Sequence, residues 1–429
     1  MRDGPSPEAD KMTNWLLDSM FQTSIRLIAE GRKADPTKVH GWIDEGSYTA
    51  ERAQKAGLVD AVEHRQDVEA ALKTRFGADV VLNHAYGKKT LPKPDFSTPF
   101  GIMRFYGELL SGPKKPESKK PAVGIVYVEG PIVVGPRDES LFMGATASSS
   151  PLRKALEDAA RDETVKAVVL RVDSPGGSAI ASEIILDATR RVKAKKPFVV
   201  SMGDVAGSGG YYVACASDVI FADASTITAS IGVVSGKLAT EGLYDKLGIR
   251  LKGYKRGANA GMLSSGQPFT PSERKAMRQY MDEVYEVFRG HVKAIRGDRL
   301  TKPLDELAGG RVFTGQQALE LGLIDKIGTL DDAIKHVASL AKLGDDYEVR
   351  TVPPPKSIIE VLMEESGGDE AKKGLLDAAE RPVLLELATP LLRALDPNRA
   401  ALVRTALGRL ELIQREGVVL MMPELGLAP

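Results

Sequence analysis

The stretch Ser201-Met-Gly-Asp-Val-Ala-Gly-Ser-Gly-Gly-Tyr-Tyr212 decides the fold of this chain. It contains the end of an apolar run, 197–202, then a glycine-rich turn, 207–210, and leads into a run of small residues, 211–216. This order predicts a buried strand, a tight turn and the start of a helix. The turn would present Ser208 where the strand gives way to the helix, which is a position suited to chemistry.

A second unit of the same kind lies upstream, around Asp173-Ser-Pro-Gly-Gly-Ser178. Residues 165–172 are apolar and largely β-branched, which predicts a buried strand. Beyond the turn, apolar residues recur on one helical face from Ile180 to Val192. Two strand-turn-helix units in succession imply βαβ crossovers and a parallel sheet, so the predicted fold class is α/β.

The glycines of the two turns are candidate ligand-binding groups. Their backbone N–H groups can face a ligand, and the N-terminal end of each following helix adds partial positive charge. This geometry suits an oxyanion formed in acyl transfer, with N–H donors at Gly176, Gly177 and Gly209 beside Ser208. Gly-Ser-Gly-Gly alone also occurs as a tight turn for close helix packing, but its combination with the upstream loop favours the catalytic interpretation.

Three segments carry a family resemblance. Asp173–Ser178, Met202–Tyr211 and Thr228-Ala-Ser-Ile-Gly232 resemble the core motifs of SppA-type signal peptide peptidases, which are serine/lysine peptidases on the ClpP/crotonase-like fold. The resemblance covers nearly the whole chain. It implies Ser208 as the nucleophile and Ser230 as a hydroxyl that orients the lysine base. It also implies peptide substrates, namely signal peptides left after secretion, a homo-oligomer, and association with the bacterial inner membrane facing the periplasm.

Composition limits the function classes. Lysine plus arginine (58) balance aspartate plus glutamate (58), so nothing suggests a nucleic-acid partner. Cys215 is the single cysteine, which excludes an intrachain disulfide and a cysteine metal cluster, and its position indicates a small packing residue. No run is long and apolar enough to predict a transmembrane segment. No cofactor or metal is expected.

The N-terminal region repeats a later one. Ser6-Pro-Glu heads a helical pattern as Thr270-Pro-Ser-Glu does, 264 residues later. Tyr48-Thr-Ala-Glu-Arg-Ala-Gln-Lys-Ala-Gly-Leu-Val-Asp60 matches the segment from Phe313 to Asp325 at an offset of 265. The near-constant shift indicates an internal repeat.

The repeat predicts the domain organisation. If the second unit starts near Pro121, the first would start before Met1, so only the tail of a first repeat is expected here. The predicted domains are a helical tail of the first repeat, a Pro- and Lys-rich linker, a ClpP/crotonase-like peptidase domain with helical extensions, and a helical C-terminal extension: 1–85, 86–121, 122–345 and 346–429. The chain resembles a long, tandem family member that lacks its first catalytic-fold half.

The general base is harder to assign. The first histidine after Ser208 is His291, inside a predicted long helix, which disfavours a Ser–His triad. A lysine base would need burial to lower its pKa towards neutrality. In short family members the lysine aligns with Ala260, and in long members it comes from the first unit, at a position that maps before Met1. Lys255 is the substitute candidate within this chain.

Other lysines downstream of Ser208 are weaker candidates for the base: Lys237, Lys246 and Lys252. Two further functions stay open at this point. One is a catalytically inactive scaffold or assembly subunit of the same fold. The other is a crotonase-type acyl-CoA enzyme that uses the same oxyanion architecture, against which the missing basic adenine-phosphate motif argues.

Overall fold

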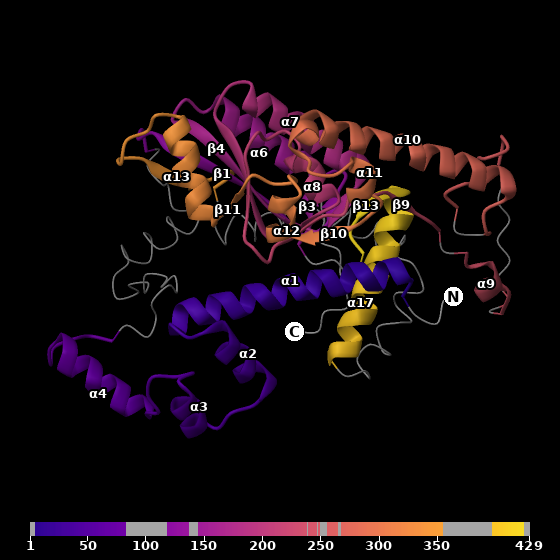
Figure 1. Cartoon of the computed structure of the whole chain (residues 1–429). Coiled ribbons are helices and arrows are strands. Elements are labelled where there is room, and N and C mark those ends of the chain that lie inside the picture. The colour runs from indigo at the N-terminus through magenta and orange to yellow at the C-terminus, as the bar shows by residue number, and fades with distance from the viewer. Residues whose placement is uncertain are drawn as a thin grey trace, which may run out of the picture. The chain divides into compact units, whose positions relative to one another are not determined.

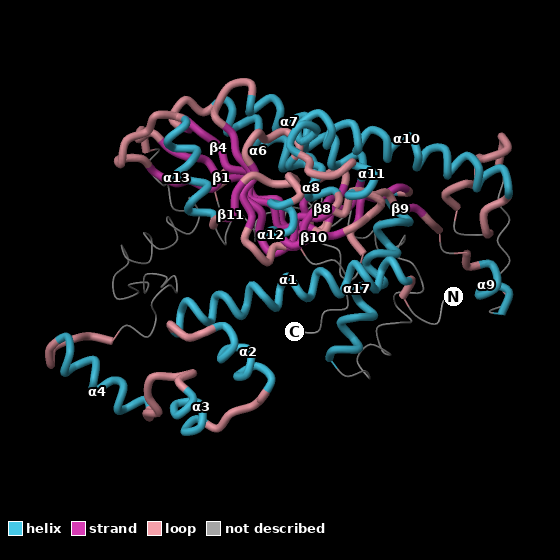
Figure 2. The backbone as a smooth tube through the Cα atoms, in the orientation of Figure 1, coloured by secondary structure: helices cyan, strands magenta, loops and turns pink. Residues whose placement is uncertain are grey.

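The computed structural model of the chain describes most of its length (Figures 1 and 2). The described residues are 5–82, 118–136, 145–237, 239–246, 248, 255–264, 267–354 and 397–423. The chain divides into two compact units. Unit 1 comprises Met1–Met20, Glu117–Lys356 and Glu365–Pro429, and unit 2 comprises Phe21–Pro116 and Ser357–Glu364. Most of the predicted linker, 86–117, lies outside the described residues.

Unit 1 is built on an eight-stranded, mainly parallel sheet in the order β10-β8-β6-β4-β1-β12, with β7 paired to β6 and to β11. The neighbours β1, β4, β6 and β8 run parallel, whereas β10 pairs with β8 antiparallel. The α/β class and the two predicted βαβ crossovers are confirmed. The strands are β1 (Ala122–Glu129), β4 (Val165–Ser174), β6 (Phe198–Gly207), β7 (Ile220–Ala222), β8 (Ile227–Ala229), β10 (Val312–Thr314), β11 (Lys326–Ile327) and β12 (Glu348–Thr351).

Helices cover both faces of this sheet (Figure 1). Successive strand residues point to opposite faces. Leu170 and Val172 of β4 therefore share a core with residues of the helices α6, α7, α8 and α10, whereas Ala167 and Val169 pack with α13. This three-layer arrangement explains why the strands are apolar on both faces and are recognisable in the sequence. The helices are α6 (Ser149–Arg161), α7 (Ala179–Lys193), α8 (Gly209–Ala214), α9 (Glu241–Lys246), α10 (Pro271–Arg296), α11 (Leu304–Leu307), α12 (Gly315–Glu320) and α13 (Leu330–Leu340).

A second, five-stranded sheet has the order β3-β2-β5-β13-β9. Its strands are β2 (Ile132–Val133), β3 (Ala147–Ser148), β5 (Gly176–Ser178), β9 (Val234–Ser235) and β13 (Val418–Met421). The last strand follows α17 (Pro397–Glu416) near the end of the chain. Although the sequence predicts only helices beyond residue 346, β12 and β13 from this segment each join a sheet of unit 1.

The N-terminal helices are α1 (Pro7–Arg32), α2 (Pro36–Asp44), α3 (Ala50–Ala56) and α4 (Arg65–Phe76). The first part of α1 belongs to unit 1, where Leu16 is fully buried against Val312 and Met422. Unit 2 has a small core of its own, built by Ile25, Ala29, Val39 and Trp42.

The internal repeat is visible in the helices. Both α1 and α10 have 26 residues and begin with a proline. The short helices α3 and α12 begin after equivalent threonines, Thr49 and Thr314, whose hydroxyl groups accept a hydrogen bond from the third helical N–H group. The two segments therefore have the same local design at the offset that the sequence indicates.

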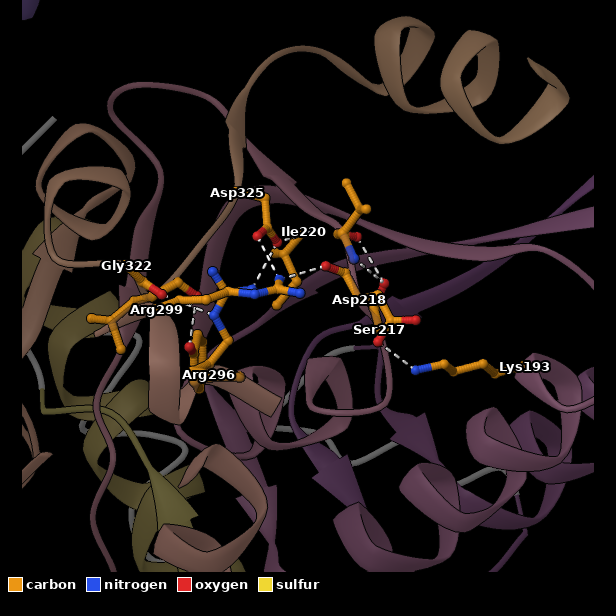
Figure 3. A network of polar contacts seen from close by, with 11 residues as sticks. Lys193, Ser217, Asp218, Ile220, Arg296, Arg299, Gly322 and Asp325 are labelled. Atoms are coloured by element: carbon orange, nitrogen blue, oxygen red, sulfur yellow. Dashed lines mark hydrogen bonds and ion pairs between the residues drawn. The ribbon is translucent and has the colours of Figure 1, made fainter. Parts of the chain in front are cut away.

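Asp325 ties the C-terminal end of α10 to the main sheet (Figure 3). Its carboxylate accepts hydrogen bonds from the Ile220 N–H of β7 at 2.8 Å, from Arg296 at 2.7 Å and from Arg299 at 2.8 Å. Arg296 is 1% exposed and also donates to the Gly322 carbonyl at 2.9 Å. Because both charges are paired and hydrogen-bonded, this buried cation is tolerated.

Across the described part of the chain, no helix combines the length and the apolar character that crossing a membrane requires.

Candidate active site

Ser208 lies between the end of β6 and the start of α8, as the sequence predicts. Strand β6 runs on to Gly207, five residues beyond the predicted end. The Ser208 N–H donates to the Ala229 carbonyl at 2.7 Å, and its carbonyl accepts from the Tyr212 N–H at 2.8 Å. The side chain is fully buried and the backbone has φ 51° and ψ −108°. A non-glycine residue in this conformation must be held there by its surroundings.

Backbone strain concentrates at this point. Besides Ser208, the neighbouring Ala229 and Ser230 have positive φ angles of 68° and 51°. Ala229 is paired in register with Gly207, so the three strained residues meet where β6 and β8 end. Such residues cost of order 1–3 kcal/mol each and cluster at functional sites. The structure thus brings Ser208 and Ser230 together, and the Ser230 N–H donates to the Arg311 carbonyl at 2.8 Å.

The three candidate oxyanion glycines are in backbone contact. A Cβ atom on Gly209 would lie 3.0 Å from Gly176 Cα and 3.1 Å from Gly177 N. A Cβ atom on Gly176, where φ is +95°, would lie 2.6 Å from Gly209 N. Only glycine fits at these positions, so the two predicted loops converge beside Ser208. The Gly176 N–H itself donates to Ser174 Oγ at 3.1 Å, and Gly177 is paired with Leu420 of β13, so Gly177 and Gly209 remain candidates as donors to a ligand.

The loop that carries Gly176 is anchored by its own polar residues. The Asp173 carboxylate accepts the Val205 N–H of β6 at 3.1 Å. The Ser174 hydroxyl donates to the Gly130 carbonyl at 2.7 Å. These bonds fix the loop to two neighbouring strands, so the glycine N–H groups are held in position before any ligand arrives.

Neither Lys255 nor Lys237 forms a hydrogen bond with Ser208 in the described part of the chain. Within the described residues, the Ser208 hydroxyl has one hydrogen-bond partner, the Gly232 carbonyl, at 3.4 Å. Lys255 is half-exposed, and its Nζ lies 3.9 Å from Glu273 Oε1. Lys237 is 4% exposed, with Nζ at 3.7 Å from the other oxygen of Glu273. The structure therefore pairs both lysines with one carboxylate at the start of α10.

A polar cluster beside α8 was not predicted. The Tyr212 hydroxyl donates to the Glu183 carboxylate, and His291 Nε2 lies 3.0 Å from the same carboxylate. Arg190 contacts the other ring nitrogen of His291 at 2.9 Å. The hydrogen bond from His291, followed by that from Tyr212, lowers the pKa of Glu183. The cluster fixes α8 against α7 and α10, but its members are too far apart in sequence to form a motif.

Cys215 is a packing residue, as the sequence indicates. It is buried, its Sγ donates to the Tyr211 carbonyl at 3.4 Å, and burial raises its thiol pKa to about 12. The thiol therefore stays protonated and unreactive near neutral pH.

Comparison with known proteins gives one family match. The model of peptidase family S49 matches residues 1–79 and 190–344, which include Ser208, Ser230 and Lys255. The loop with Gly176 and Gly177 lies outside the matched ranges.

Individual relatives agree with this match. The chain is 29% identical to the chloroplastic serine protease SPPA of Arabidopsis thaliana over 88% of its own length and 54% of the relative's. It is 30% identical to protease 4 of Salmonella typhi over 80% of this chain and 53% of the relative. A putative protease of Synechocystis is 37% identical over 54% of this chain and 84% of its own. The chain thus spans about half the length of the first two relatives.

Among solved structures, this chain is similar to the 1510-N membrane-bound stomatin-specific protease (S97A mutant). The match covers 55% of this chain and 99% of the solved chain. The sequence identity is 16% and the TM-score is 0.34.

Proposed function

Because this chain belongs to peptidase family S49, we propose that it carries the nucleophile of a serine endopeptidase that works by acyl transfer through Ser208. One observation carries the proposal. Ser208 is held in a strained conformation at the N-terminus of α8, in direct sequence with Gly209, whose backbone touches Gly176 and Gly177. A serine beside converging backbone N–H groups is the arrangement that acyl transfer requires.

The proposed reaction has two stages. Ser208 Oγ attacks the scissile carbonyl carbon, its proton passes to a base, and the carbonyl electrons move onto oxygen, which the Gly177 and Gly209 N–H groups stabilise. Collapse of this intermediate breaks the C–N bond, and the departing amine takes the proton. Water then hydrolyses the acyl-enzyme by the same steps and regenerates the Ser208 hydroxyl.

The base is proposed to be a lysine oriented by Ser230, in keeping with the resemblance. Lys255 is the candidate within this chain, and it would have to leave Glu273 to reach Ser208. The alternative is a lysine from an upstream first unit or from a partner chain, since Ala260 stands at the position where short relatives have theirs. The proposed substrates are signal peptides remaining in the membrane. A homo-oligomer associated with the inner membrane and facing the periplasm would give access to them.

The test is hydrolysis of a fluorogenic, leucine-rich peptide by the 429-residue chain, with Ser208→Ala as the blank and Lys255→Ala as the second variant. Activity lost in both variants would support Lys255 as the base. If only Ser208→Ala lost activity, the base would be a group other than Lys255. If Ser208→Ala were as active as the parent, the proposed nucleophile would be wrong.

A non-catalytic scaffold of the same fold is the second candidate. The observation in its favour is that, among the described residues, the Ser208 hydroxyl bonds to a carbonyl oxygen, which cannot accept its proton. Labelling with a fluorophosphonate distinguishes the two functions. A scaffold would leave Ser208 unlabelled even when the chain is mixed with an upstream first unit that carries a lysine.

A further inference from the structure

The helices α7 and α8 each begin at one of the loops that carry the candidate oxyanion donors. Gly177 precedes Ser178, the N-cap residue of α7, and Gly209 is the first residue of α8. The two helices touch near these ends, because a Cβ atom on Gly209 would lie 2.8 Å from Ser182 Oγ of α7. The distance between the Gly177 and Gly209 N–H groups therefore depends on how α8 sits against α7.

A side-chain hydrogen bond joins the two helices beside Gly209. The Tyr212 hydroxyl of α8 donates to the carboxylate of Glu183, the residue that follows Ser182 in α7. Tyr212 is 3% exposed, and its ring packs on Phe288 of α10 with ring centroids 4.8 Å apart. A hydrogen bond to an ionised carboxylate is stronger than one between neutral groups. Tyr212 therefore holds the first turn of α8 on α7.

The backbone of the same tyrosine is bonded to Ser208. The Tyr212 N–H donates to the Ser208 carbonyl at 2.8 Å. Ser208 has a φ of 51°, and a non-glycine residue keeps such a strained conformation only while its surroundings hold it. Tyr212 thus links the strained residue to Glu183, because its amide bonds to one and its hydroxyl to the other.

The Glu183 carboxylate is itself oriented from α10. Arg190 Nη2 lies 2.9 Å from His291 Nδ1, and a guanidinium group only donates hydrogen bonds, so this ring nitrogen is the acceptor. The proton of the neutral imidazole is then on Nε2, which donates to Glu183 Oε2 at 3.0 Å. Arg190 Nη1 lies 3.8 Å from the other carboxylate oxygen. The carboxylate is therefore held from two sides at the place where Tyr212 reaches it.

We propose that Glu183 and Tyr212 are positioning residues for the acyl transfer at Ser208. Their hydrogen bond fixes α8 on α7, and so it sets the spacing of the Gly177 and Gly209 N–H groups. Donors that are fixed in advance stabilise a developing oxyanion without reorganisation. A misplacement of about 1 Å can cost about a hundred-fold in rate. The inference rests on the proposed function, and it adds residues that act on the reaction through other groups.

Tyr212→Phe removes the hydroxyl and keeps the ring, and Tyr211→Phe is its matched control. Tyr211 is the neighbouring residue of α8, is also buried, and donates its hydroxyl to the Leu323 carbonyl at 2.7 Å. Both variants lose a buried hydrogen bond of the same helix, but only Tyr212→Phe loses the bond to Glu183. In the 429-residue chain, Tyr212→Phe should lower kcat for a leucine-rich peptide about ten-fold or more at an unchanged KM. Tyr211→Phe should leave kcat close to that of the parent.

Two variants of Glu183 test the bond from its other end. Glu183→Gln keeps an oxygen that can accept the Tyr212 hydroxyl, so it should retain most of the activity. Glu183→Ala should match Tyr212→Phe. The double variant Glu183→Ala/Tyr212→Phe should be no less active than either single variant, because both changes act through one bond. A contribution to stability alone would lower the activity of Tyr211→Phe as much as that of Tyr212→Phe.

Hydrogen exchange decides the matter if the parent chain hydrolyses no peptide, an outcome that would contradict the proposed function. The amide at position 212 is bonded to Ser208, so its protection reports how firmly the first turn of α8 is held, without any reaction. It should exchange about ten-fold faster or more in Tyr212→Phe than in Tyr211→Phe. The amides of β4, which report global unfolding, should not distinguish the two variants.

Two results would overturn the proposal. Where the parent is active, it would be wrong if Tyr212→Phe and Tyr211→Phe had equal kcat values. Where the parent is inactive, it would be wrong if the amide at position 212 exchanged equally fast in the two variants.

Discussion

The same arginine–aspartate motif occurs twice in this chain, once in unit 2 and once in unit 1. Arg32 closes α1, donates to the Gly57 carbonyl at 3.0 Å and pairs with Asp60 at 2.9 Å. Arg296 closes α10, donates to the Gly322 carbonyl at 2.9 Å and pairs with Asp325 at 2.7 Å. The local geometry is therefore repeated in nearly every bond.

The two motifs differ in their surroundings. The Asp60 side chain is 89% exposed and that of Arg32 28%, whereas the values for Asp325 and Arg296 are 18% and 1%. Asp325 also accepts the Ile220 N–H of a strand, and unit 2 has no strand among its described residues. One motif is thus a surface ion pair and the other joins a helix to a sheet. The local sequence determines which hydrogen bonds form. Burial against the sheet determines how much they contribute to the free energy of unfolding.

The largest expected effect is that of Asp325→Ala. The change leaves the buried Arg296 guanidinium without its carboxylate and the Ile220 N–H without an acceptor. Breaking a buried pair from one side costs about 3–5 kcal/mol. The free energy of unfolding of unit 1 should fall by this amount in urea. Trp15, which packs on Phe313, reports this unit when Trp42 is replaced by Phe.

Asp305→Ala is the control for this measurement, because Asp305 pairs with Arg289 in the same unit but is 77% exposed. Its effect should stay below about 1 kcal/mol. If the two variants lost equal amounts of unfolding free energy, burial would not explain the contribution of the Asp325 network to stability.

A second comparison uses the helix that follows each motif. Ala333 of α13 is fully buried under the main sheet, and the position 265 residues earlier is Val68 of α4, which is 43% exposed. Ala333→Asp places a larger, ionisable side chain in a packed apolar layer and should cost about 2–4 kcal/mol. Val68→Asp should change stability by less than about 0.5 kcal/mol. Urea unfolding of the two variants, read from Trp15 and Trp42, is the measurement.

The middle of the long helix supplies a smaller, pH-dependent difference. His291 of α10 bonds Glu183, whereas the equivalent residue of α1, Leu27, is 56% exposed. The hydrogen bond from His291 lowers the Glu183 pKa from 4.5, so this carboxylate binds fewer protons folded than unfolded. Its contribution to stability is present above the unfolded pKa and is lost as the pH falls through the folded pKa.

Glu183→Gln should therefore lower the urea midpoint at pH 7, and its difference from the parent should shrink as the pH falls below the ordinary glutamate pKa. The effect at pH 7 is expected to be small, because the Glu183 side chain is 44% exposed. Glu286→Gln, on the solvent-facing side of α10, is the control. An effect of Glu183→Gln that does not diminish as the pH is lowered would contradict a charge-based origin.

The fold was largely predictable because its signals are local and strong. Strands such as 165–172 are buried on both faces, so they are continuous apolar runs. The glycine-rich segments that follow them indicate tight turns. The α8 start was displaced by two residues because the helix begins at Gly209, in a turn whose glycines conceal it. The strand β13 was missed because four apolar residues after a helix give no periodicity, and its partners lie more than 180 residues away.

That the candidate site residues lie close together was predictable to the same extent, whereas their catalytic roles stay a prediction. Ser208, Gly176, Gly177, Gly209 and Ser230 belong to two turns and a strand end that parallel β-strands bring to one edge, which topology alone implies. Lysine contacts cannot be predicted in this way, because a long side chain in a loop goes where its charge is matched. The pairing of lysines with Glu273 depends on the capping of α10, where Glu273 also accepts the Thr270 N–H.

The smallest expected effect belongs to Asp60→Ala, and it tests the comparison most directly. The change removes the carboxylate that is equivalent to Asp325 in the repeat, and Arg32 bonds it as Arg296 bonds Asp325. Arg32 holds the pKa of Asp60 below its usual range, but water can replace the carboxylate at this exposed site. Trp42, with Trp15 replaced by Phe, should report an unchanged urea midpoint for unit 2. A clearly lower urea midpoint would mean that the motif stabilises unit 2 without contacting a sheet. Burial could then not explain the difference between the repeats.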